Sequence, residues 1–137
     1  MNKVVQVDEE YIFEGSILIS QTDLKGIITF ANRKFCEVSG YKVDELIGSN
    51  LNIIRHPDMP KAIFSKMWTS IQDGQSWNGL VKNLRKDGLC YWVDTEIIPI
   101  HDDKEEIIGY ISAKNVASRK DIQENEDLYK KILETEN

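Results

Sequence analysis

Hydrophobic and polar positions repeat along this chain in two ways, either every second residue or every three to four residues. Each change from one pattern to the other marks the boundary of an expected element. After a polar lead, residues 17–20 and 27–31 have strand-like composition, and a turn around Gly26 separates them. These two runs predict a β-hairpin. Asn32 follows as a candidate helix N-cap, and the next residues predict one or two helical turns that end at Gly40. A second short helix is expected to end at Gly48.

A longer helix is predicted in the middle of the chain, because apolar residues recur there at intervals of three and four. The positions that share this spacing are Met59, Ile63, Phe64, Met67, Trp68 and Ile71. Asp58 is the expected N-cap of this helix, and Asp73 with Gly74 is expected to close it.

Strict alternation returns after this helix and predicts strands over residues 77–85 and 89–100, followed by a last strand over 107–116. Residues on one face of a strand are two positions apart. The first of these strands therefore places Trp77 and Asn83 on the same face. The next strand has Tyr91, Val93, Thr95 and Ile97 on one side and Trp92 and Ile98 on the other. We expect the Trp92 face to contact the N-terminal segment, the C-terminal tail or a second subunit.

The order of elements indicates one α+β domain, because the short helices are grouped between two sets of strands. The length of 137 residues also suits a single domain. From Ser118 onward the sequence is strongly charged, with apolar residues at Ile122, Tyr129, Ile132 and Leu133. This part predicts a terminal helix whose pattern is too interrupted to establish a coiled coil.

Composition excludes several classes of function. The net charge of −6 disfavours nucleic-acid binding, which depends on clustered Lys and Arg. No apolar run approaches the roughly 20 residues of a membrane span. We therefore expect a cytoplasmic protein, with any membrane association coming through a longer parent receptor or a partner. Cys36 and Cys90 form no CxxC pair, which predicts reduced, partly buried thiols rather than a disulfide framework or a zinc site.

Three stretches resemble one family of sensor domains. They are "ITFANRKFCEVSGY", "RHPDMPKAIFSKMW" and "WNGLVKNLRKDG" followed by "YWV". Together with the order of elements they resemble a PAS domain, and within that family they are similar to the FAD-binding PAS domain of bacterial aerotaxis receptors. The resemblance implies a five-stranded antiparallel sheet with short helices on one face. It covers residues 15–117, which leaves 1–14 as an N-terminal cap segment and 118–137 as a C-terminal signalling helix.

The resemblance also implies the residues that bear on FAD binding. Transferred position by position, they are Asn32, Arg55, His56, Asp58, Trp77 and Asn83. Their chemistry suits a dinucleotide, since it needs an apolar slot for the ring, hydrogen-bond partners for its heteroatoms and cationic donors for its pyrophosphate.

Each of these residues also has a purely structural interpretation. Arg55 and Asp58 would form a local ion pair and a helix cap, His56 would be a satisfied polar group in a turn, and Asn83 would bond only to backbone. Trp77 would belong to the core. Asn32 is foremost a helix cap.

The leading functional hypothesis is a sensor that holds FAD noncovalently and signals redox state or oxygen to a transducer. The C-terminal helix and one sheet face would contact the transducer or a second subunit. One alternative is a PAS domain for haem or another small ligand, for which His56 is the credible axial ligand. Another is an apo module for protein interaction or dimerisation. The short helix lacks the cysteine of a blue-light flavin photoreceptor, and no motif indicates an enzyme.

Overall fold

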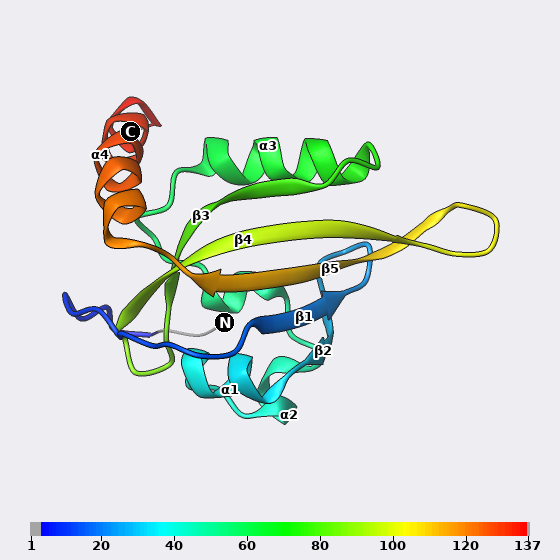
Figure 1. The fold of residues 1–137 in the computed structure, drawn as a ribbon, viewed down its shortest axis with the longest axis horizontal. Helices are drawn as coiled ribbons and strands as arrows, with labels where there is room; N and C mark the ends of the chain where they lie inside the picture. The colour runs from blue at the N-terminus through cyan, green and yellow to red at the C-terminus, as the bar shows by residue number, and fades with distance from the viewer. Residues whose placement is uncertain (1–3, 137) are drawn as a thin grey trace.

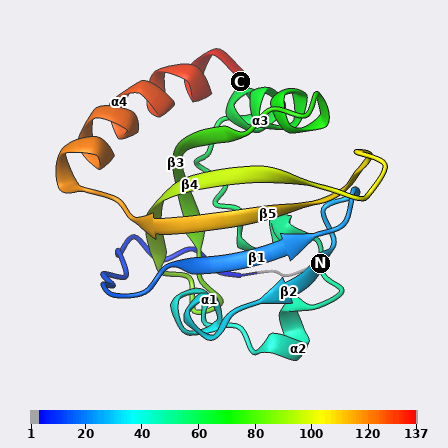
Figure 2. The same cartoon turned by 45° about the vertical axis from the view of Figure 1, so that its right-hand side comes forward.

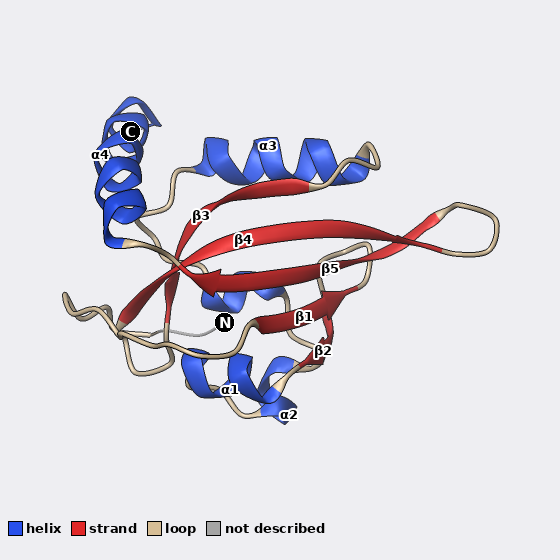
Figure 3. Ribbon diagram, viewed as in Figure 1, coloured by secondary structure: helices blue, strands red, loops and turns tan. Residues whose placement is uncertain are grey.

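The computed structural model describes residues 4–136, so residues 1–3 and 137, at the ends of the predicted cap and tail segments, lie outside it. A five-stranded antiparallel sheet with strand order β2-β1-β5-β4-β3 forms the centre (Figures 1 and 3). Its strands are β1 (Leu18–Thr22), β2 (Ile28–Ala31), β3 (Trp77–Leu84), β4 (Cys90–His101) and β5 (Ile107–Val116). The predicted hairpin and the three later strands are confirmed.

The short helices lie between the two sets of strands in sequence, as predicted. They are α1 (Arg33–Ser39), α2 (Val43–Leu46), the 3₁₀ helix η1 (Leu51–Ile54) and α3 (Lys61–Gln72), and the chain closes with α4 (Arg119–Glu136). The side chain of Asn32 accepts a hydrogen bond from the Phe35 N–H, which confirms the predicted N-cap of α1. In Figure 1, α3 runs beside β3, and α1 and α2 lie near β2 at the other edge of the sheet.

The expected start of the central helix was wrong. Asp58 is not its N-cap, because α3 begins at Lys61 and Pro60 occupies the cap position with ψ of 139°. Proline also disfavours helical backbone at the residue before it, so Met59 cannot extend the helix backward easily. The capping acceptor comes from α4: the Glu136 carboxylate accepts hydrogen bonds of 2.9 Å from the N–H groups of Lys61 and Ala62.

Strand register sets the face of the sheet that the short helices cover, called here the inner face. Asn83 pairs with Tyr91 across β3 and β4, and Lys114 of β5 pairs with Thr95. Because paired residues point to the same side of a sheet, these side chains and Trp77 share the inner face. The predicted alternation in β3 and β4 is therefore confirmed, and β5 adds to this face a lysine, Lys114, that was not predicted there.

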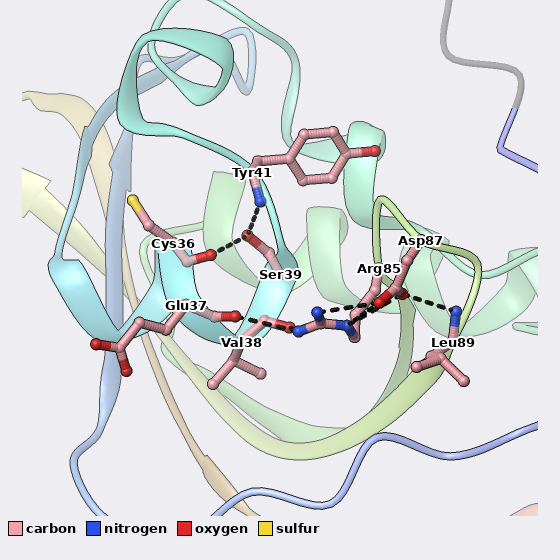
Figure 4. Close-up of polar contacts among 8 residues, drawn as sticks. All are labelled: Cys36, Glu37, Val38, Ser39, Tyr41, Arg85, Asp87 and Leu89. Atoms are coloured by element: carbon pink, nitrogen blue, oxygen red, sulfur yellow. Dashed lines mark hydrogen bonds and ion pairs between the residues drawn. The ribbon is translucent and has the colours of Figure 1, made fainter.

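Arg85 fixes the β3–β4 turn to the end of α1 (Figure 4). Its guanidinium donates to the carbonyl oxygens of Glu37 and Val38 and pairs with Asp87. Free carbonyl groups at a helix C-terminus favour such a cation. Arg85 also stacks 3.8 Å above the Tyr11 ring, so one side chain joins the N-terminal segment, α1 and the sheet.

Helix α4 covers part of the opposite, outer face of the sheet. The Tyr129 ring stacks on Trp92 with centroids 6.2 Å apart, and its hydroxyl donates a 2.6 Å hydrogen bond to the Leu80 carbonyl. The end of α4 then passes the edge strand β3 and reaches the start of α3 (Figure 2). Of the partners considered for the Trp92 face, the structure places the C-terminal helix there, and residues 10–13 of the N-terminal segment line a hollow together with Trp92. No helix in residues 4–136 is both long and apolar enough to cross a bilayer.

Replacing Tyr129 with phenylalanine should loosen α4 without unfolding the sheet. The substitution leaves the buried Leu80 carbonyl without its donor, which costs about 1–3 kcal/mol. We expect faster amide hydrogen exchange in residues 119–136 and little change in β1 and β5. Tyr11→Phe is the matched control, because the Tyr11 hydroxyl makes no hydrogen bond within the described residues. Equal exchange in the two variants would contradict the proposed role of Tyr129.

Candidate functional site

A cavity of about 100 Å³ lies between the inner face and the helices η1 and α3. Its apolar lining residues are Leu51, Ile54, Phe64, Met67, Trp68, Val81 and Ile97. Its polar lining residues are Asn50, Asn52, Arg55, Asn83, Thr95, Ser112 and Lys114. An apolar wall facing a row of convergent polar groups is typical of a small-molecule site.

The sheet side of this cavity contains buried polar atoms that lack partners. Thr95 Oγ1 and Asn83 Nδ2 make no hydrogen bond, and the same holds for Ser20 Oγ and the Tyr91 hydroxyl on the same face. The Asn83 amide faces the Tyr91 hydroxyl without reaching hydrogen-bond geometry. An unsatisfied buried polar group costs about 1–3 kcal/mol. Four such groups on one face indicate a surface suited to a polar ligand.

Arg55 lies at the mouth of the cavity, where the cavity meets a second hollow, called here the outer groove. The outer groove is lined by Asn52, Arg55, His56, Pro57, Met59, Lys61, Phe64, Ser65, Trp68 and Thr69. Its backbone forms a β-bridge with Asn83, so the two predicted site residues are adjacent. The guanidinium stacks 3.9 Å from the centroid of the Phe64 ring, and both side chains line the cavity and the groove. Desolvation lowers the pKa of Arg55 and the Glu136 carboxylate raises it, so the end of α4 acts electrostatically on this cation.

His56 is buried next to Arg55 and lines the outer groove. Its Nδ1 accepts a 3.0 Å hydrogen bond from the Asp58 N–H, which requires this nitrogen to be unprotonated. Burial, together with the positive charge of Lys82, lowers the pKa of His56 to about 4, and Asp58 opposes this effect only in part. The imidazole is therefore neutral near pH 7.

Asp58 points away from the cavity, toward the outer face and α4. Its carboxylate lies 3.3 Å from Lys82 Nζ, and both residues line a hollow shared with Tyr129. The expected Arg55–Asp58 ion pair is not among the ion pairs of the described residues. The segment from Arg55 to Lys61 thus lines the cavity at its first residue and contacts α4 at its last.

Asn32 and Trp77 are not among the residues that line the cavity. Asn32 uses its side chain to join β1 and α1: it donates to the Ile17 carbonyl and accepts from the N–H groups of Ile19 and Phe35. The Trp77 ring lies over Gly79, where an added Cβ would be 2.5 Å from two ring carbons. Both residues shape the elements around the cavity.

Five polar residues of the cavity were not predicted as site residues: Asn50 and Asn52 at the start of η1, and Thr95, Ser112 and Lys114 on the sheet. A local signal was present, because Ser112 and Lys114 alternate in β5 with apolar or small residues. Lysine is usually placed at the surface by default. Only the pairing of β5 with β4 shows that this lysine points inward.

Known proteins resemble this chain in sequence and in fold. The family model described as PAS fold matches residues 28–113. The aerotaxis receptor of Escherichia coli K12 is 44% identical over 119 residues, which make up 87% of this chain and 23% of the receptor. The nitrogen fixation regulatory protein of Klebsiella pneumoniae is 32% identical over 99 residues, or 72% of this chain and 20% of that protein. This chain thus spans less than a quarter of either relative.

A solved structure shares the same fold. The crystal structure of the PAS domain of a protein from Colwellia psychrerythraea aligns with a TM-score of 0.69 at 24% identity. The alignment covers 75% of this chain and 87% of that domain.

Proposed function

Because this chain belongs to the PAS family, we propose that it is a sensory module that binds FAD noncovalently and signals redox state or oxygen to a transducer. Residues 15–117 form the sensor unit in this proposal, residues 1–14 a cap segment, and residues 118–137 the signalling helix. Bound FAD would supply a centre that accepts and releases electrons. The protein itself would bind and signal rather than catalyse a reaction.

The observation that carries the proposal is the mixed lining of the cavity. Phe64, Met67 and Trp68 provide an apolar wall suited to a flat aromatic ring, and the opposite side presents Asn83 and Thr95 with unpartnered polar atoms. A flavin ring needs both surfaces, since its faces are apolar and its edge carries hydrogen-bonding atoms. We assign Asn83 to the ring and Arg55, at the cavity mouth, to the pyrophosphate, which suits a guanidinium fork.

Binding FAD also requires movement at the mouth. Pockets for small molecules usually hold roughly 300–1,000 Å³, and this cavity holds about 100 Å³. The stacked pair of Arg55 and Phe64 lines both the cavity and the outer groove. We propose that this pair opens to admit the flavin ring, which leaves the rest of the dinucleotide in the groove beside His56.

The same segment gives a route for the signal. Arg55 is attracted by Glu136, and Glu136 caps the first turn of α3. A ligand phosphate at Arg55 would compete with Glu136 for the same positive charge. We therefore propose that occupancy shifts α4, which presents the output to a transducer or to a second copy of the chain. Asp58 and Lys82 add a second contact between this segment and α4.

The relative named as an aerotaxis receptor supports the choice of stimulus. The stretch "RHPDMPKAIFSKMW", which contains Arg55 and His56, also resembles the PAS domain of such receptors. The activity of a whole receptor extends beyond this chain, so taxis toward oxygen stays part of the proposal.

The test is the absorbance spectrum of freshly purified protein from about 300 to 700 nm, with the released chromophore identified by mass. A flavin spectrum and released FAD are the expected result. A haem Soret band would overturn the FAD assignment and direct attention to His56. A blank spectrum that added FAD does not change would favour an apo interaction module.

A further inference from the structure

Lys114 is a charged side chain enclosed within the fold. It lies on the inner face of β5, between Thr95 of β4 and Leu18 of β1, and only 4% of its surface is exposed. It lines the same cavity as Asn83 and Arg55. Lysines this enclosed are rare unless an opposite charge accompanies them.

No carboxylate accompanies Lys114 in the described part of the chain. Its Nζ donates a 2.8 Å hydrogen bond to Ser112 Oγ and lies 5.1 Å from the centroid of the Phe35 ring. These contacts use only part of the donor capacity of an ammonium group. The other charged residue of the cavity, Arg55, is also a cation, so the cavity lining has positive charge and no negative charge.

Burying the Lys114 ammonium group without an opposite charge destabilises its protonated form, and the pKa of the group reflects this. Burial lowers the pKa of Lys114 to about 8, so the side chain is still mostly protonated at neutral pH. A methionine of similar length would fill the space without that cost. The structure therefore keeps a positive charge whose burial its contacts with Ser112 and Phe35 only partly offset.

We infer that Lys114 is a ligand-contact residue that binds negative charge at the deep end of the cavity. This inference rests on the proposed function, and it assigns Lys114 to the flavin ring while Arg55 serves the pyrophosphate. Two electrons and one proton convert the neutral oxidised ring to a reduced ring with one negative charge. Lys114 then binds the reduced form more tightly than the oxidised form, which raises the midpoint potential of the bound flavin.

The decisive variant is Lys114→Met in the full chain, compared with Lys114→Arg and with Lys104→Met. Lys104 lies in the exposed β4–β5 turn, so its replacement removes the same charge away from the cavity. The midpoint potential is measured by dithionite titration against a reference dye, and the affinity for oxidised FAD by fluorescence titration. A ten-fold loss of preference for reduced flavin in Lys114→Met corresponds to a potential about 30 mV lower for this two-electron couple.

We expect Lys114→Met to lower the potential by at least this amount, while Lys114→Arg and Lys104→Met stay close to the parent. Flavin-free Lys114→Met should also unfold at a higher denaturant concentration than the parent, whereas a purely structural lysine would make the variant less stable. An FAD-binding parent whose potential is unchanged in Lys114→Met would overturn this inference alone. A parent chain that binds no FAD would overturn the proposed function and this inference together.

Discussion

Replacement of Arg55 by alanine should weaken FAD binding by roughly 10- to 100-fold, because a charge-assisted hydrogen bond contributes about 1.5–3 kcal/mol. Arg55 lines both the cavity and the outer groove, at the place that we assign to ligand entry, and its guanidinium stacks on Phe64 rather than pairing with a carboxylate. The measurement is fluorescence titration of flavin-free protein with FAD. The fold should persist, since the side chain of Arg55 is exposed.

Two further variants separate the role of Arg55 from that of net charge. Arg33→Ala removes one exposed arginine from α1, outside the cavity lining, and should leave the affinity unchanged. Arg55→Lys keeps the charge but loses the planar fork, so we expect an intermediate affinity. If Arg55→Ala and Arg33→Ala bound FAD equally well, the assignment of Arg55 to the ligand would be wrong.

Acidification from pH 6.5 to pH 4 should lower the free energy of unfolding by roughly 2–3 kcal/mol through His56. The folded protein holds the pKa of His56 at about 4, below the 6.5 of an unperturbed histidine. Between these two values the unfolded chain binds a proton that the folded chain does not bind, so acid favours unfolding. Below about pH 4 both states are protonated and this contribution no longer grows.

The check is denaturant unfolding at several pH values in the parent, His56→Asn and His101→Asn. Asparagine retains an acceptor near the position of Nδ1 but does not titrate, so His56→Asn should lose most of the slope between pH 6.5 and pH 4. His101, the only other histidine of the chain, is exposed at the end of β4 and serves as the control. A slope that persists in His56→Asn would show that another group causes the acid sensitivity.

The neutral state of His56 also argues against a role for this residue in following the charge on a bound flavin. A histidine near its titration point could follow changes in flavin charge. The structure instead buries His56 and commits Nδ1 to the Asp58 N–H. Lys114 is the better candidate for a residue that responds to charge on the ring, because it lines the cavity and carries a proton at neutral pH.

The sheet and its two faces could be predicted from sequence because alternation is a local property. The two-residue repeat of a strand predicted the face of the sheet on which Trp77, Asn83 and Tyr91 lie, and the register of β3 and β4 confirms these faces. The N-cap at Asn32 could also be predicted from neighbouring residues, since it depends only on the Asn32 side chain and the N–H group of Phe35, three residues later. The PAS family could also be recognised from the sequence, because its motifs lie in short continuous stretches.

Other features depended on residues far apart in the chain. Asp58 was a reasonable helix cap on local grounds, but Pro60 moved the start of α3 and Glu136, 75 positions from Lys61, supplied the acceptor. Trp77 was expected to line the ligand cavity. Its ring lies over Gly79 on the inner face, outside the cavity lining, and its contact with FAD stays a prediction.

What the sequence determined by itself was therefore the order of elements, the faces of the strands and the family, because each depends on neighbours along the chain. Only the tertiary structure decided which polar groups are enclosed without partners. Thr95 and Lys114 lie side by side because β4 and β5 pair in one register, and no carboxylate among residues 4–136 pairs with the lysine. Burial and charge pairing depend on residues that are close in the fold but far apart in the sequence. For this reason only the structure identifies Lys114 as a candidate for binding the ligand.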